Sequence, residues 1–240
     1  MANALKIISV LLSYPSAELL AAADELREAI AADRLTGPRE KAWLRALVDD
    51  LGGRDLYDAE ERYVLLFDRT RTLSLHLFEH VHGESRDRGQ AMVDLLAMYE
   101  DKGLAAIKNE LPDYLPLFLE FLATLPQADS CDLLGQPAHI LGALAERLRK
   151  RASPYEAVLR ALVALSAVKP KGEEVSALLA LPDPDPLDLV ALDAAWEDEQ
   201  VQFGPGAADS CKDGLMAHVR GALRPAPGMP SSSTRTPPRQ

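Results

Sequence analysis

The sequence is poor in cysteine and contains no long apolar run. Its two cysteines, Cys131 and Cys211, stand alone, which excludes a Cys-x-x-Cys zinc or thioredoxin-type motif and a disulfide framework. The most apolar stretch near the N-terminus covers only residues 7–12 and is followed by Tyr14 and Pro15. That is far short of the roughly 18 apolar residues of a membrane span. We therefore expect a cytoplasmic protein without a targeting segment.

Positive charge is also scarce. The 240 residues contain 26 lysines and arginines against 37 aspartates and glutamates, which gives a formal net charge of −11. Residues 224–240 contain arginines and no acid, so the body of the chain is more acidic still. Such a surface repels phosphate backbones, and we expect neither nucleic-acid binding nor membrane insertion. An acidic surface is common in soluble proteins, and it would also attract a basic partner segment.

The strings that mark common nucleophile and nucleotide sites, such as Gly-x-Ser-x-Gly and Gly-x-Gly-x-x-Gly, are absent from the sequence. One catalytic string is present, His76-x-x-Glu79-His80, which is that of the inverzincin metallopeptidases. On a helix the two histidines would lie one turn apart and could bind Zn²⁺, with Glu79 as the base. The candidates for a third ligand are Glu84, Asp94 and Glu100. Because only three positions are fixed, two histidines on a half-buried helix are the simpler interpretation, and a zinc metallopeptidase is the alternative.

Apolar residues recur every three or four positions along most of the chain, which is typical of amphipathic helices. The breaks between these stripes carry helix start and stop residues, with Ser16 and Ser85 as expected N-caps and Gly103 as an expected stop. Residues 73–77 are the exception, because leucines alternate there with polar residues as in an extended segment. The pattern predicts an all-α protein, a single globular helical bundle of about eight or nine helices.

The composition of the sequence changes after residue 180, where prolines interrupt the helical pattern. Alternating prolines exclude a helix over residues 181–186, and a short acidic helix with Trp196 is expected over residues 187–200. We divide the chain into a helical domain (1–180), a Pro/Asp-rich linker with the short acidic helix and a weak C-terminal segment (181–223), and a disordered Pro/Ser/Arg tail (224–240).

A Leu-Pro-Asp-Tyr string begins the clearest apolar stripe. Pro112 suits the first position of a helix and Asp113 the first turn, where the helix dipole favours a carboxylate. A good helix start explains this pattern by itself. A functional interpretation adds that Asp113 and Tyr114 stand at the mouth of an apolar groove lined by Phe118 and Leu122. An acidic group beside an apolar groove would suit a basic amphipathic peptide.

Three segments carry a family signature, and a fourth, Trp196-Glu197-Asp198-Glu199-Gln200-Val201-x-Phe203, supports it. The three are Tyr63-x-x-x-Phe67-Asp68-Arg69, the block Leu77-Phe78-Glu79-His80-Val81-His82-Gly83-Glu84-Ser85-Arg86-Asp87-Arg88-Gly89-Gln90-Ala91-Met92, and Leu111-Pro112-Asp113. Over about residues 5–204 the chain resembles the NarJ family of assembly chaperones. The wider group contains the redox-enzyme maturation chaperones of the TorD and DmsD type.

The resemblance implies an all-helical cytoplasmic chaperone that catalyses nothing and is not part of the finished enzyme. Such proteins bind the apo catalytic alpha subunit of respiratory nitrate reductase, chiefly at its N-terminal leader, with the alpha–beta complex as a further candidate partner. They keep it from premature membrane docking. They also assist insertion of the molybdenum bis-guanine-dinucleotide cofactor without binding it permanently. This chain has Tyr114 where the family commonly has histidine, which puts a histidine-based pH switch at that position in doubt.

In this family, leader binding is attributed to an apolar groove near the Pro-Asp motif. We therefore predict a partner-binding site whose acidic side chains attract basic leader residues, and no catalytic or metal-binding residues. The predicted site residues are Tyr63, Phe67, Asp68, Glu79, His80, Asp113, Tyr114 and Phe118. A permanent structural subunit of a membrane complex is a third hypothesis. Such a subunit would stay with the mature reductase, whereas a chaperone would be absent from it.

Overall fold

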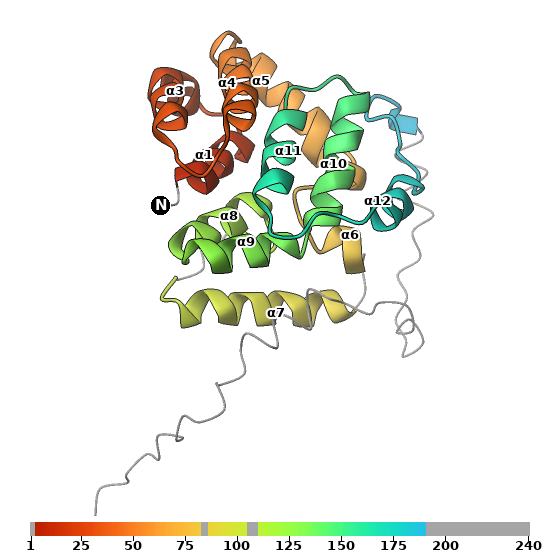
Figure 1. Cartoon of the computed structure of the whole chain (residues 1–240). Coiled ribbons are helices and arrows are strands. Elements are labelled where there is room, and N and C mark those ends of the chain that lie inside the picture. Colours follow the sequence, from red (N-terminus) through yellow and green to blue (C-terminus); the bar gives the residue numbers. More distant parts are fainter. Residues whose placement is uncertain (1–2, 83–85, 105–109, 191–240) are drawn as a thin grey trace, which may run out of the picture.

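The computed structural model describes residues 3–82, 86–104 and 110–190, and Figure 1 gives its course. The all-α prediction is confirmed, since these residues form helices and no named strand. The N-terminal helices are α1 (Asn3–Leu12), α2 (Ala17–Ala21), α3 (Ala23–Ala32), α4 (Pro38–Gly52) and α5 (Leu56–Tyr63). A π-helix η1 (Val64–Asp68), a 3₁₀ turn η2 (Arg71–Leu73), and α6 (Glu79–His82) and α7 (Arg86–Asp101) follow. The remainder is α8 (Leu115–Thr124), α9 (Gln127–Gly135), α10 (Ala138–Lys150), α11 (Glu156–Leu165) and α12 (Gly172–Leu179).

The described residues thus contain twelve α-helices where the sequence suggested eight or nine. The difference comes from short helices. One apolar stripe over residues 17–32 is divided at Ala22 into α2 and α3, and α6 has only four residues. Periodicity alone does not reveal such breaks, because the apolar spacing continues across them.

Local chemistry sets several helix ends as predicted. The Ser16 side chain accepts a hydrogen bond from the backbone N–H of Leu19 at 3.2 Å and caps α2. Gly103 lies in the left-handed region at φ +78° after α7. There the N–H of Gly103 donates to the carbonyl of Glu100 and the N–H of Leu104 to that of Tyr99, which is a Schellman motif. Ser85, the other expected N-cap, lies outside the described residues.

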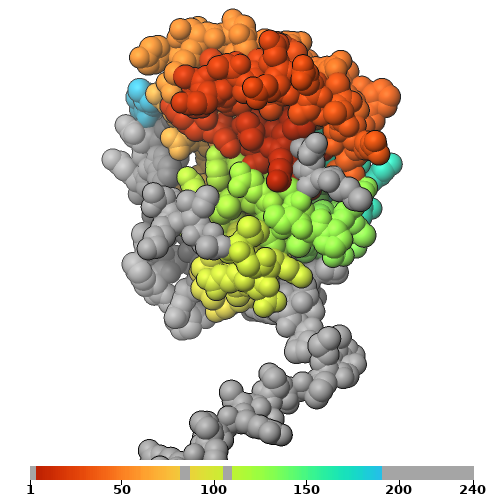
Figure 2. Space-filling model, turned by 90° about the vertical axis from the view of Figure 1, so that its left-hand side faces the viewer, coloured from red at the N-terminus to blue at the C-terminus, as the bar shows by residue number. Residues whose placement is uncertain are grey.

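The helices pack around one hydrophobic core. α1 packs against α8, α10 against α11, and α4 against both α3 and α11. Figure 1 shows α7 below α8 and α9, where the Tyr99 ring contacts Phe121 of α8 with centroids 4.6 Å apart. In Figure 2 the N-terminal helices form one end of the molecule, and residues near 115–135 and then α7 follow below them.

The predicted helix start at Pro112 is wrong. α8 begins at Leu115, with Tyr114 as its N-cap residue and Pro116 in its first turn. Asp113 precedes the helix because its backbone carbonyl accepts the N–H of Leu77 and its carboxylate accepts the N–H of Phe78. These tertiary hydrogen bonds replace the helical ones that the local sequence favours.

Beyond α12 the structure describes residues 181–190, and residues 182–185 form no helix, as the alternating prolines predict. Most of the predicted acidic helix, including Trp196, and the segment and tail up to residue 240 lie outside the described residues. Among the helices that are described, none combines the length and apolarity that crossing a bilayer would need.

Two glycines of the α7 region offer a matched test of the helix end. We expect Gly103→Ala to lower the free energy of unfolding by about 1 kcal/mol, because alanine is strained at positive φ. Gly89→Ala, in the interior of α7, should raise it by about 0.5–1 kcal/mol, because alanine is the better helix former. An added Cβ meets no atom within 4 Å at either position, so backbone conformation alone separates them. Urea denaturation measures both, and changes of the same sign would contradict the Schellman assignment.

Candidate functional site

Two segments of the sequence signature meet in space. His76 and Tyr114 form an isolated antiparallel bridge. Beside it, the N–H of Leu77 donates to the carbonyl of Asp113 at 3.1 Å, and the N–H of Leu115 donates to the carbonyl of Leu75 at 2.8 Å. The alternation of leucines at residues 73–77 therefore corresponds in part to a short extended segment around His76, while Leu73 ends the 3₁₀ turn η2; all three leucines are buried. This pairing places the residues around Glu79 next to the Pro-Asp motif.

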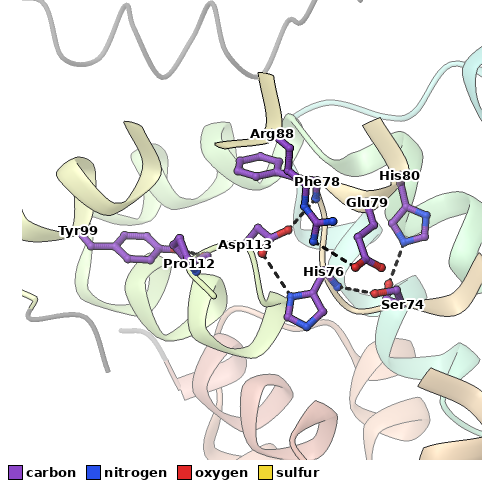
Figure 3. Close-up of polar contacts among 9 residues, drawn as sticks. All are labelled: Ser74, His76, Phe78, Glu79, His80, Arg88, Tyr99, Pro112 and Asp113. Carbon is purple, nitrogen blue, oxygen red and sulfur yellow. Dashed lines mark hydrogen bonds and ion pairs between the residues drawn. The ribbon is translucent and has the colours of Figure 1, made fainter. Parts of the chain in front are cut away.

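Asp113 is the centre of this junction and is fully buried. One carboxylate oxygen accepts the backbone N–H of Phe78 at 3.1 Å, and the other accepts the Nδ1 hydrogen of His76 at 3.3 Å (Figure 3). The neighbouring Pro112 carbonyl accepts the hydroxyl of Tyr99 at 2.7 Å, which ties the same turn to α7. Because its oxygens are used internally, Asp113 builds the site and does not face a ligand.

A surface pocket of about 580 Å³ opens beside this junction. Its lining comes from four parts of the chain: the end of α1, the region of η1 and η2, the extended segment with the start of α6, and the turn before α8. The lining residues are Tyr14, Tyr63, Val64, Phe67, Asp68, Thr70, Arg71, Ser74, Leu75, His76, Glu79, Glu110 and Tyr114. The π-helix η1 supplies three of them, and such π turns often occur at functional sites.

Tyrosine rings and hydroxyls form one wall of the pocket. The Tyr63 hydroxyl donates to the carbonyl of Leu12 at 2.8 Å. Its hydrogen is therefore engaged, and the Tyr114 hydroxyl, 2.9 Å away, donates to the Tyr63 oxygen. Desolvation raises the pKa of both hydroxyls above the ordinary tyrosine value. The pair stays protonated and neutral, and Tyr14 packs edge-on against Tyr63 with centroids 5.4 Å apart.

Three carboxylates lie on the pocket wall and rim. Glu79 is paired with Arg88, with the two charged groups 3.1 Å apart. Asp68 and Glu110 are exposed and have no ion-pair or hydrogen-bond partner among the described residues. Unpaired acids beside neutral aromatic rings can bind a cationic side chain with a hydrophobic stem.

The structure brings five of the eight predicted site residues together at this pocket: Tyr63, Phe67, Asp68, Glu79 and Tyr114. The other three lie elsewhere. Asp113 is buried behind the pocket, and His80 donates from Nε2 to the Ser74 carbonyl at 2.8 Å. Phe118 and Leu122 pack in the core and do not line this pocket, although Phe118 borders a separate small apolar cavity with Phe78 and Leu95.

The sequence did not single out several lining residues. His76 entered only as a possible zinc ligand, and Glu110 directly precedes the Leu-Pro-Asp string, so proximity to a motif could have identified both. Tyr14 carried no such signal. It reaches the pocket because α1 packs against α8, and this contact between distant segments has no local signature.

The geometry does not fit the zinc site of the metallopeptidase alternative. His76 precedes α6, whereas His80 lies within it, so the two imidazoles are not one turn apart on a helix. His76 directs Nδ1 to Asp113 and His80 directs Nε2 to the Ser74 carbonyl. In residues 3–82, 86–104 and 110–190, no three His, Cys, Asp or Glu side chains are grouped as metal ligands. Of the proposed third ligands, Asp94 and Glu100 are on α7, and Glu84 lies outside the described residues.

Asp113 should be important for stability. We expect Asp113→Leu to lower the free energy of unfolding by about 2–3 kcal/mol, because it leaves the buried N–H of Phe78 without an acceptor. Asp113→Asn should cost less, since its amide oxygen can still accept that hydrogen bond. Chemical denaturation followed by circular dichroism measures both variants. Equal losses for the two would contradict the acceptor role.

The two histidines should act on stability in opposite pH directions. The hydrogen bond to Asp113 raises the pKa of His76 above its usual 6.5, so its stabilisation is complete at lower pH and is lost as pH rises through the folded-state pKa. Burial lowers the pKa of His80, so its stabilisation is complete above about pH 6.5 and is lost as pH falls. The groups that act on them are Asp113, Glu79, Arg88 and Arg147.

Chemical denaturation at pH 5.5 and pH 8 measures the pH dependence of each histidine's contribution to stability. The stability difference between wild type and His76→Gln should be larger at pH 5.5, and that between wild type and His80→Gln larger at pH 8. The same pH trend in both variants would contradict the assigned pKa directions.

Comparison with known proteins identifies the family. The family described as nitrate reductase delta subunit matches residues 16–160. The nitrate reductase molybdenum cofactor assembly chaperone NarJ of Escherichia coli (strain K12) is 44% identical over 223 residues, which cover 92% of this chain and 94% of the relative. The probable chaperone NarW of the same strain is 43% identical over 207 residues, 86% of each chain. The probable chaperone NarJ of Bacillus subtilis (strain 168) is 31% identical over 173 residues, 65% of this chain and 84% of the relative. The chain therefore belongs to the nitrate reductase delta subunit family.

Proposed function

We propose that this protein is a non-catalytic assembly chaperone for a respiratory nitrate reductase. It binds the apo catalytic alpha subunit in the cytoplasm and assists insertion of the molybdenum cofactor before the enzyme docks at the membrane. The names of its relatives as molybdenum cofactor assembly chaperones support this proposal, and their similarity extends over most of the chain. None of these names supports the metallopeptidase alternative.

The pocket is the proposed site for the N-terminal segment of the alpha subunit. The observation that carries this assignment is that two carboxylates, Asp68 and Glu110, have no ion-pair partner among the described residues and lie in a pocket with the Tyr63–Tyr114 wall. A basic side chain of the peptide would place its charge near these acids and its aliphatic stem along the tyrosine rings. With about 580 Å³, the pocket accommodates a few side chains of an amphipathic helix, whose remaining surface lies outside.

The chemistry of the pocket favours binding over catalysis. Its two central hydroxyls are neutral and bonded to each other, so neither is activated as a nucleophile. Binding the leader hides an apolar peptide until its own subunit has matured.

The molybdenum cofactor is bound by the partner subunit and not by this protein. We propose that it is the bis-guanine-dinucleotide form. The alpha–beta complex is a second proposed partner, because it presents the same leader.

Calorimetric titration tests the peptide site. A peptide that copies the N-terminus of the cognate alpha subunit should bind the wild-type full chain with affinity in the micromolar range or better. Asp68→Asn combined with Glu110→Gln should weaken binding about tenfold, because two attractive charges are removed, each worth roughly 0.5–1 kcal/mol at an exposed site. Raising the salt concentration should reduce the difference between variant and wild type.

Glu25→Gln combined with Glu28→Gln is the matched control. Both are exposed acids of α3 that do not line the pocket, and the double change removes two negative charges, as the pocket variant does. This control should bind the peptide like the wild type. Absence of binding by the wild type at tens of micromolar would overturn the proposed function. Equal weakening by the control would show that only net charge matters and would remove the pocket assignment.

A further inference from the structure

One side of the pocket is a turn that is held in place by residues from other parts of the chain. We call residues 69–74 the rim turn. It lies between η1 and the extended segment, contains η2, and supplies Thr70, Arg71 and Ser74 to the pocket. A turn of this length has few hydrogen bonds of its own, so its position depends on what it packs against.

Two side chains, Arg147 and the half-buried His80, hold the rim turn from beneath. Arg147 of α10 is only 2% exposed and donates from Nη1 to the carbonyl of Thr72 at 2.8 Å. The same guanidinium donates from Nη2 to the carbonyl of Leu178, at the end of α12, at 2.7 Å. His80 donates to the Ser74 carbonyl. Arg147 thus joins the pocket rim to the C-terminal part of the fold.

A second connection comes from residues 178–186, which we call the C-terminal strap. One carboxylate oxygen of Asp183 accepts both the hydroxyl of Thr72 and Nη2 of Arg151, each at 2.7 Å. The Arg69 guanidinium donates to the carbonyl of Pro186 at 3.2 Å. Figure 1 shows the blue segment after α12 running beside α10, whose end leads into Arg151.

The composition of the strap favours a fixed conformation against the rim turn. Its alternating prolines fix φ at three positions and restrict the residues before them, so little conformational entropy is lost when the strap is held against the rim. The charge of Asp183 also affects the pKa of the buried Arg147. Desolvation lowers the pKa of Arg147, and the charge of Asp183 opposes that effect. The strap lies beyond residues 16–160, where the family matches, although it contacts the rim of the pocket.

We propose that the C-terminal strap is a positioning element of the peptide site and that Asp183 holds the rim turn, through Thr72, in its binding-competent position. This inference rests on the proposed function. Asp183 does not itself line the pocket, so it acts through the rim turn. When a fraction of the molecules loses this position, the apparent dissociation constant rises in inverse proportion to the competent fraction.

A double-mutant cycle on the full chain tests the proposal with the same leader peptide. Thr72→Val and Asp183→Ala should each raise the dissociation constant by about three- to tenfold, as expected when the competent fraction falls to between a third and a tenth. The double variant should bind no more weakly than whichever single variant binds the peptide less tightly. The reason is that both changes break the same hydrogen bond, between Thr72 and Asp183. Asp183→Asn keeps an acceptor for the Thr72 hydroxyl and should retain most of the affinity.

Hydrogen exchange separates positioning from general destabilisation. In Asp183→Ala, backbone amides of residues 69–74 should exchange faster while those of α1 and α8 keep wild-type protection. Glu156→Gln is the matched control. It removes one ion pair of similar length on α11, Glu156–Arg160 at 2.8 Å, neither member of which bonds to the rim turn or the strap, and should leave both affinity and exchange unchanged.

The outcomes are distinct. If the wild type binds the peptide and Thr72→Val and Asp183→Ala bind equally well, the positioning role is overturned and the proposed function stands. Strictly additive losses, or faster exchange throughout the protein, would likewise overturn it. If the wild type does not bind the peptide, the proposed function and the inference that rests on it both fail.

Discussion

The buried carboxylate of Asp113 is the constraint on which the rest of the site depends. An ionised carboxylate away from water is costly unless hydrogen bonds satisfy its oxygens. Here the donors are the Phe78 amide and the His76 ring, so the turn before α8 is held against the extended segment around His76. That contact places Tyr114 beside Tyr63 and directs Glu79 toward the pocket. Together with the backbone hydrogen bonds between Leu77 and Asp113 and between Leu115 and Leu75, it fixes the relative position of two segments more than thirty residues apart.

Buried and exposed polar groups have different tasks in this fold. Asp113, His80 and Arg147 donate to or accept from the backbone of the segments that form the pocket, and they hold these segments in place. Asp68 and Glu110 have no such bonds among the described residues and are available to a ligand. Satisfied polar groups give a pocket its shape, and unsatisfied exposed ones give it affinity for an opposite charge.

The pocket joins parts of the chain that are far apart in sequence. Its lining and the junction at Asp113 fall largely within residues 16–160. Its rim is bonded to Asp183 and, through Arg147, to the carbonyl of Leu178, which follow that region. A change in such a bracing segment can alter affinity without altering any residue that touches the ligand.

The sequence by itself determined the all-α class, the N-cap at Ser16, the helix stop at Gly103 and the non-helical proline segment, because each depends on neighbouring residues and on backbone conformation. It also identified five residues that line the pocket, through a family signature carried by contiguous segments. Only the tertiary structure decided that Pro112 and Asp113 lie outside α8, that His76 and His80 have separate partners, that Phe118 belongs to the core, and that Tyr14 and Glu110 line the pocket. The physical reason is the same in each case. Hydrogen bonds and packing between residues tens of positions apart outweigh local helix preferences of a few tenths of a kcal/mol, and no local pattern encodes them.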